Sequence, residues 1–142
     1  MVNIFMEEAL KYAKMAAENG EIPVGAVIVH NNEIIFAAHN LKETQHDPTA
    51  HAEILALKGA AKVLGDWRLE NCDIYVTLEP CPMCASAISQ ARTRRLYFGA
   101  FDPAFGGAGS YTNLLNGTEV YGGIMEQECT DILNRFFENR RR

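Results

Sequence analysis

The most constraining feature of the sequence is a strand, helix and strand in succession between residues 73 and 100. Residues 73–78 predict a strand, and the Glu-Pro pair that follows ends it. Pro82 can occupy the first turn of a short helix, which we expect to end near Ala91. Residues 95–100 predict the next strand. This order favours a right-handed crossover between parallel strands, and therefore an α/β fold.

The region before this succession predicts a helix and a β-hairpin. Apolar residues recur at helical spacing near the N-terminus, where Asn3 can cap the start of the helix and Gly20 its end. Two largely apolar runs, residues 24–30 and 33–39, flank the pair Asn31-Asn32, which tolerates the positive φ of a tight hairpin turn. We therefore expect an antiparallel strand pair.

Two further helices complete the expected order. The first should begin at Asp47-Pro48, a cap followed by a first-turn proline, and end at Gly65. A stripe of apolar residues from Ile124 to Phe137 predicts a terminal helix that ends in the arginines 140–142. The predicted fold class is α/β, a three-layer αβα arrangement with a mixed central sheet of about five strands. We expect residues 1–142 to form a single domain.

Charge and composition exclude several classes of protein. The 142-residue chain carries a net charge of −5, which argues against wholesale coating of nucleic acid or anionic membrane. The basic residues of the second half, 71–142, are all arginine, a side chain suited to phosphates and to stacking. The N-terminus lacks a signal-peptide pattern, and the longest uncharged apolar run, residues 22–29, is too short to span a bilayer. Four cysteines without secretory features indicate a reducing compartment, so we expect a cytoplasmic protein.

Two short motifs carry the candidate chemistry: His51-Ala52-Glu53, and a Pro-Cys-Pro-Met-Cys stretch that ends at Cys84. Both are predicted at helix starts at the same end of the sheet, so they can converge. Cys81 and Cys84 are three positions apart, which places both sulfurs on one side of a first helical turn. Two thiolates and the His51 imidazole provide the three protein ligands of a catalytic zinc site, with a fourth position open for water. Glu53 is then placed to accept a proton from that water.

A Cys-x-x-Cys pair can instead be a redox pair or half of a structural zinc site. A structural zinc needs four protein ligands, and the two other cysteines are poorly placed to supply them. Cys129 falls in the apolar stripe of the terminal helix, and Cys72 lies at a strand start. We therefore expect both to be small core residues.

Taken as a whole, the sequence resembles the bacterial tRNA-specific adenosine deaminases of the cytidine deaminase-like superfamily. The resemblance runs nearly end to end and includes residues 25–28, 46–53, 77–84 and 98–110 and the terminal Phe136-Phe137 pair. The zinc motifs are shared across the superfamily, whereas the Gly-rich loop after Phe98 and the phenylalanine pair are particular to this family. The resemblance implies hydrolytic conversion of the wobble adenosine of a tRNA anticodon to inosine. It also implies a homodimer that holds one Zn²⁺ per subunit and binds the anticodon stem-loop, with no membrane involved.

The same resemblance implies roles for individual residues. The zinc ligands are His51, Cys81 and Cys84, and Glu53 is the catalytic proton shuttle between zinc-activated water and the adenine. The substrate-binding residues are Asn40, Asp102, Phe136, Phe137 and Arg140. From the residues alone, Asn40 and Asp102 are more typical of turns than of substrate binding, and terminal arginines can simply complement a helix dipole. The chain departs from its relatives at Ala104, where they commonly carry lysine, and Phe105 follows it; stacking there can replace a phosphate contact.

Two other functions fit the same motifs. A free-base or nucleoside deaminase acting on guanine or cytosine would use the same zinc chemistry, but it would not need the Gly-rich loop or the arginine-bearing last helix. A zinc-dependent RNA-binding module without catalysis would need the metal ligands but not Glu53.

Overall fold

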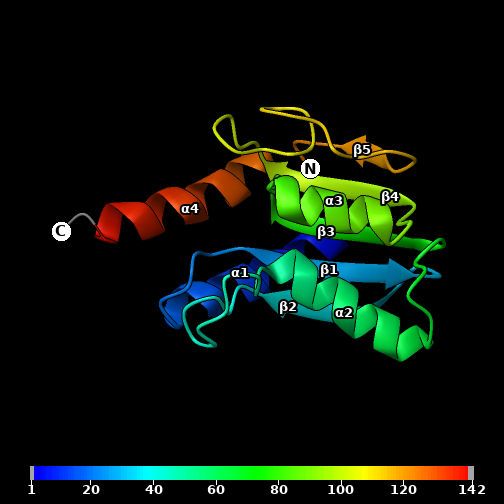
Figure 1. The fold of residues 1–142 in the computed structure, drawn as a ribbon. Coiled ribbons are helices and arrows are strands. Elements are labelled where there is room, and N and C mark those ends of the chain that lie inside the picture. The colour runs from blue at the N-terminus through cyan, green and yellow to red at the C-terminus, as the bar shows by residue number, and fades with distance from the viewer. Residues whose placement is uncertain (1, 141–142) are drawn as a thin grey trace.

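The computed structural model describes residues 2–140, which fold around one five-stranded sheet (Figure 1). The strands are β1 (Gly25–His30), β2 (Glu33–His39), β3 (Cys72–Leu78), β4 (Arg95–Ala100) and β5 (Glu119–Tyr121), in the spatial order β2-β1-β3-β4-β5. The helices are α1 (Ile4–Glu18), α2 (Ala52–Leu64), α3 (Pro82–Gln90) and α4 (Glu126–Arg140). None of the helices within residues 2–140 has the length and apolar character needed to cross a membrane. Arg141 and Arg142 of the predicted arginine run lie outside the described residues.

The strand pairing confirms the mixed sheet. β1 pairs antiparallel with β2, and the turn between them uses Asn31 and Asn32 at φ of 51° and 65°. β1 also pairs antiparallel with β3, whereas β3 pairs parallel with β4 and β4 with β5. The predicted crossover between parallel strands is therefore present, with α3 as its helix.

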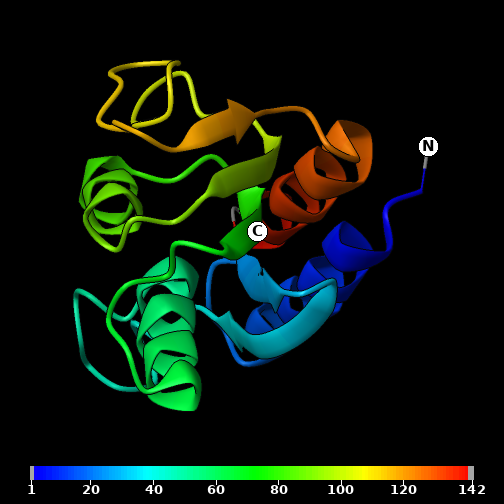
Figure 2. The same cartoon turned by 90° about the vertical axis from the view of Figure 1, so that its right-hand side faces the viewer.

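The helices cover both faces of the sheet, which gives the predicted three layers (Figure 2). α1 and α4 pack on one face and α2 and α3 on the other. Neighbouring strand residues serve opposite faces: Ile28 belongs to the core beneath α2 and α3, and Val27 to the core beneath α1 and α4. Cys72 and Cys129 are fully buried, one in each core, as predicted.

The predicted start of the second helix was wrong. α2 begins at Ala52 rather than at Asp47-Pro48. The Asp47 carboxylate instead accepts hydrogen bonds from the backbone N–H and the hydroxyl of Thr49, at 2.8 and 2.7 Å, which closes a separate turn before the helix. The predicted end was right, since Gly65 is the C-cap in a left-handed conformation.

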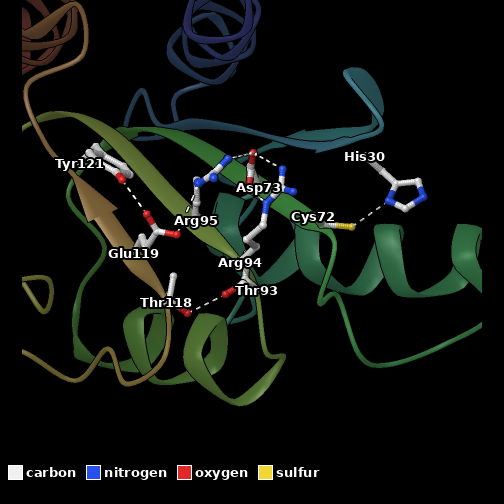
Figure 3. Close-up of polar contacts among 9 residues, drawn as sticks. All are labelled: His30, Cys72, Asp73, Thr93, Arg94, Arg95, Thr118, Glu119 and Tyr121. Atoms are coloured by element: carbon white, nitrogen blue, oxygen red, sulfur yellow. Dashed lines mark hydrogen bonds and ion pairs between the residues drawn. The ribbon is translucent and has the colours of Figure 1, made fainter.

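Ion pairs and a hydrogen bond join segments distant in sequence at the edge of the sheet formed by β4 and β5 (Figure 3). The guanidinium of Arg94 makes two 3.0 Å bonds to the Asp73 carboxylate, and Arg95 lies between Asp73 and Glu119. The Thr118 hydroxyl donates to the Thr93 carbonyl at 2.7 Å. These contacts hold β5 against β4. β5 has only three residues, so no alternating pattern in the sequence could predict it.

Candidate active site

Three side chains that can hold a metal ion meet where α2 and α3 begin. The Nδ1 atom of His51 lies 3.7 Å from the Sγ of Cys81 and 3.5 Å from the Sγ of Cys84. All three ligand atoms lie within 4.8 Å of one another. Tetrahedral zinc, with Zn–S of about 2.3 Å and Zn–N of about 2.0–2.1 Å, separates sulfur from nitrogen by roughly 3.5 Å. The donor types and their spacing therefore fit one Zn²⁺ held by three protein ligands.

The helix starts leave these side chains free to bind a metal. His51 and Cys81 are the N-cap residues of their helices, yet neither side chain makes a cap hydrogen bond. Pro82 follows Cys81 at the first helical position, where a missing N–H costs nothing. The partial positive charge at the start of a helix also favours a thiolate there.

The protonation of the cluster is uneven. A hydrogen bond from the Cys84 thiol is the main factor that lowers the pKa of Cys81 to about 4. The same bond, together with burial, raises the pKa of Cys84 far above its ordinary value. The hydrogen bond with Cys81 also raises the pKa of His51. Because a metal binds the thiolate and the neutral imidazole, both raised pKa values oppose metal binding as pH falls.

Glu53 is buried beside the cluster, on the first turn of α2, with 4% of its surface exposed. Burial raises the pKa of Glu53 to about 7, and the nearby charge of Cys81 adds to the rise. A carboxyl group with a pKa near neutrality can both accept and release a proton at pH 7. The arrangement thus pairs a metal-binding group with a proton-transfer group.

A cavity of about 780 Å³ reaches this cluster, a volume in the range of small-ligand sites. His51, Glu53 and Cys81 line it, while Cys84 is buried and does not. The five residues predicted to bind substrate also line it, namely Asn40, Asp102, Phe136, Phe137 and Arg140. The fold therefore brings the predicted site residues to one place, although they come from five separate parts of the chain.

The chain matches the family model for the cytidine and deoxycytidylate deaminase zinc-binding region over residues 2–100. It belongs to this deaminase family. The match and the His-Cys-Cys group together support one zinc per chain.

Relatives resemble the deaminase chain over most of its length. The tRNA-specific adenosine deaminase of Bacillus subtilis is 50% identical over 98% of this chain and 90% of its own length. A solved structure from work on A-to-I editing by tRNA:A34 deaminases is 43% identical, covers 92% of this chain and 99% of its own, and superposes with a TM-score of 0.86. The structure of Bacillus subtilis guanine deaminase is 41% identical over 71% of this chain and 66% of its own, with a TM-score of 0.67.

Asn40 has a structural task in this deaminase that its sequence position did not reveal. Its amide oxygen accepts the Ala52 N–H at 2.8 Å, so it caps α2 from twelve residues away. Its amide nitrogen donates to the Ile22 carbonyl at 3.1 Å. That nitrogen carries a second N–H, and Asn40 lines the cavity. The Asn40 side chain thus fixes the start of α2, where His51 and Glu53 lie. Its second amide N–H has no partner among residues 2–140 and can donate into the cavity.

Glu79 has an importance that its sequence position, in a strand-breaking pair within the 77–84 motif, does not reveal. Its buried carboxylate accepts the backbone N–H groups of Asp102, Ala108 and Ser110 at 3.0–3.1 Å, and also the Ser110 hydroxyl. Gly106 packs so closely against it that a Cβ there would lie 2.4 Å from the carboxylate. Glu79 therefore fixes the Gly-rich loop that forms one wall of the cavity.

Glu21 was missed altogether, since it belongs to no motif. It is 1% exposed, and its carboxylate accepts the N–H of Glu43 at 3.1 Å and the N–H and hydroxyl of Thr44 at 2.7 and 2.6 Å. Burial alone would raise the pKa of Glu21, but the bonds from Thr44 and Glu43 lower it below its ordinary value. Glu21 therefore holds the loop at residues 41–46 against the cavity. The sequence could not show this, because its partners Glu43 and Thr44 lie more than twenty residues away.

Glu21→Gln is expected to lower the free energy of unfolding at pH 7 by about 1.5–3 kcal/mol, the range for hydrogen bonds to a buried charged group. The pKa of Glu21 is lowered in the folded state, so its stabilisation is present above the unfolded pKa and lost as pH falls through the folded one. Urea unfolding of wild type and variant should therefore differ at pH 7 and converge in acid.

Glu43→Gln is the matched control, because Glu43 offers only its backbone N–H to Glu21 and its own side chain is exposed. It should unfold like wild type at both pH values. Equal stability of Glu21→Gln and wild type at pH 7 would show that Glu21 does not hold the loop.

Proposed function

We propose that this chain hydrolyses the wobble adenosine of a tRNA anticodon to inosine, with release of ammonia. The observation that carries the proposal is the extent of the similarity to proteins named for this activity. The Bacillus subtilis relative matches 98% of the chain, and the A34 deaminase structure covers 92% of it with a TM-score of 0.86. The similarity therefore covers nearly the whole chain and not only the zinc motifs, which other deaminases share.

In this proposal Glu53 carries the protons of the reaction. Zinc, when held by His51, Cys81 and Cys84, supplies the Lewis acidity that activates water for attack at adenine C6. Glu53 would take one proton from that water and pass it to adenine N1. It would then take the second proton from the oxygen newly bonded to C6 and deliver it to the departing amine, which leaves a C6 carbonyl and ammonia. Its pKa of about 7 suits both transfers, and its burial keeps bulk water from exchanging the proton in transit.

The cavity walls would bind the nucleotide. The second amide N–H of Asn40, which has no partner among residues 2–140, is proposed to hold the purine edge. One oxygen of Asp102 already accepts the N–H groups of Ala104 and Phe105 at 3.2 Å, and its other oxygen is proposed to bind the target ribose. Phe136 and Phe137, on α4, would contact flanking nucleotides.

Arg140 is proposed to face the RNA from a fixed position. Its guanidinium donates to the Gly20 carbonyl at 2.7 Å and lies 4.6 Å from the centre of the Phe136 ring. These contacts join the last turn of α4 to the segment after α1, and Arg140 lines the cavity from there. By the same likeness to tRNA-specific deaminases we propose a single-domain, cytoplasmic homodimer.

A guanine deaminase is the alternative with specific support, because a structure of that name is 41% identical to this chain. It aligns with 71% of the chain, compared with 92% for the A34 deaminase structure, which is why we favour the RNA substrate.

The purified protein is expected to form inosine in an anticodon stem-loop with adenosine at the wobble position. Inosine would be measured by nucleoside chromatography after digestion, and a stem-loop with guanosine at that position serves as the control. Ammonia release from free guanine, cytosine and adenosine would be followed in parallel. Turnover of a free base without inosine in RNA would overturn the proposal, and RNA binding without any turnover would favour the non-catalytic module.

A further inference from the structure

Phe105 is the feature of the cavity that the proposed chemistry does not use. It lines the same cavity as His51 and Glu53, yet 67% of its surface is exposed. In the part of the chain that the structure describes, its ring stacks on no other aromatic ring. Because this exposed ring lines the cavity, it is available to contact a ligand that enters there.

The loop that carries Phe105 is fixed by hydrogen bonds. The Asp102 carboxylate accepts the N–H groups of Ala104 and Phe105, and the Asp102 carbonyl accepts the N–H of Gly106 at 2.8 Å. The buried carboxylate of Glu79 holds Asp102 itself through its N–H. Little backbone freedom remains to be lost when a ligand meets this ring.

The charges around the cavity indicate what kind of contact can contribute binding there. Of its described charged lining residues, Glu21, Glu53 and Glu79 are buried, whereas the acidic Glu43 and Asp102 and the basic Lys42 and Arg140 reach the surface. The Arg140 guanidinium is already engaged with the Gly20 carbonyl. The surface-reaching part of the lining therefore carries no excess of positive charge to attract phosphates, so contacts to the faces of bases gain importance over contacts to the backbone.

We propose that Phe105 is a stacking platform for a nucleobase adjacent to the target adenosine. The inference rests on the proposed RNA substrate and adds a binding subsite to it. An adenosine drawn into the cavity leaves its neighbours unstacked at the rim, where a fixed exposed ring replaces the lost stacking. Stacking tolerates any base, so the subsite favours RNA over a free nucleoside without selecting its sequence.

The test compares Phe105→Ala and Phe105→Tyr with wild type on an anticodon stem-loop. We expect Phe105→Ala to raise KM by about 5- to 150-fold, the range for losing one stacked base, with kcat within about 2-fold. Phe105→Tyr should restore the wild-type KM, since it keeps the ring. Tyr111→Ala is the matched control, because Tyr111 is 69% exposed on the same loop but does not line the cavity.

Substrates with an abasic site on the 5′ or the 3′ side of the target identify the partner. For one of them, wild type and Phe105→Ala should have the same KM, because the stacked base is already gone. The inference is overturned if Phe105→Ala leaves KM unchanged, if its defect persists in full with both abasic substrates, or if kcat alone falls. Failure of wild type to form inosine in the intact stem-loop is a separate result, which would overturn the proposed function and the subsite with it.

Discussion

Glu53→Ala is expected to lower kcat for deamination by about 10²- to 10⁴-fold or more, the contribution typical of a positioned acid–base group. The carboxyl group is buried beside the metal-binding cluster, and its pKa of about 7 equips it for both proton transfers. Zinc content and fold should be retained, because the three ligands come from other residues. Single-turnover inosine formation, metal analysis and circular dichroism measure these three properties.

Glu53→Gln separates the loss of a proton carrier from the loss of packing. The amide fills nearly the same volume but cannot accept a proton from water, so its kcat should be as low as that of Glu53→Ala. Glu70→Gln serves as the control, because Glu70 is exposed in the turn before β3. Near-normal activity in either Glu53 variant, with zinc bound, would remove Glu53 from the mechanism.

The parts of the site that could be predicted from sequence are those set by local geometry. Cys81 and Cys84 share a helical turn because they are three positions apart, and Pro82 marks where that turn begins. His51 could be placed beside them only by assuming that both helices start at one end of the sheet. The crossover at residues 73–100 locates only the start of α3. The start of α2 depends on the antiparallel pairing of β1 with β2 and with β3.

The parts that could not be predicted depend on partners distant in sequence. Asn40 and Glu21 look like ordinary turn residues until the fold brings Ala52 and Thr44 against them. β5 has three residues, too few for a pattern, and it is held by contacts such as Arg95 with Glu119. Asp47-Pro48 could begin a helix, but the Asp47 carboxylate closes a turn with Thr49, and Asn40 caps α2 at Ala52 instead.

The arginines show why charge composition was a weak guide to RNA contact. Arg94 makes a bidentate pair with Asp73, and Arg92 lies 5.3 Å from the Trp67 ring, so both have partners within the fold. Arg140 lines the cavity but is also bonded to the Gly20 carbonyl. An arginine-rich second half therefore does not by itself make a phosphate-binding surface.

Cys84→Ser is expected to reduce bound zinc from one ion per chain to a small fraction of that value, with loss of deamination. The serine hydroxyl is a much poorer zinc ligand than a thiolate, and the remaining Cys81 and His51 cannot complete a three-ligand site. Metal analysis of freshly purified, unchelated protein measures the content. A chelator should lower the Tm of wild type but leave that of the variant unchanged, because metal bound only to the folded state stabilises it.

Cys72→Ala is the matched control, since Cys72 is also buried but lies on β3 outside the cluster, with its Sγ 3.7 Å from Nδ1 of His30. It should keep one zinc per chain whatever its effect on stability. In wild type, zinc affinity should fall as pH falls, because the pKa values of Cys84 and His51 are raised and both groups must lose protons to bind metal. Absence of metal from unchelated wild type, or full zinc in Cys84→Ser, would mean that the cluster is not the zinc site of this deaminase.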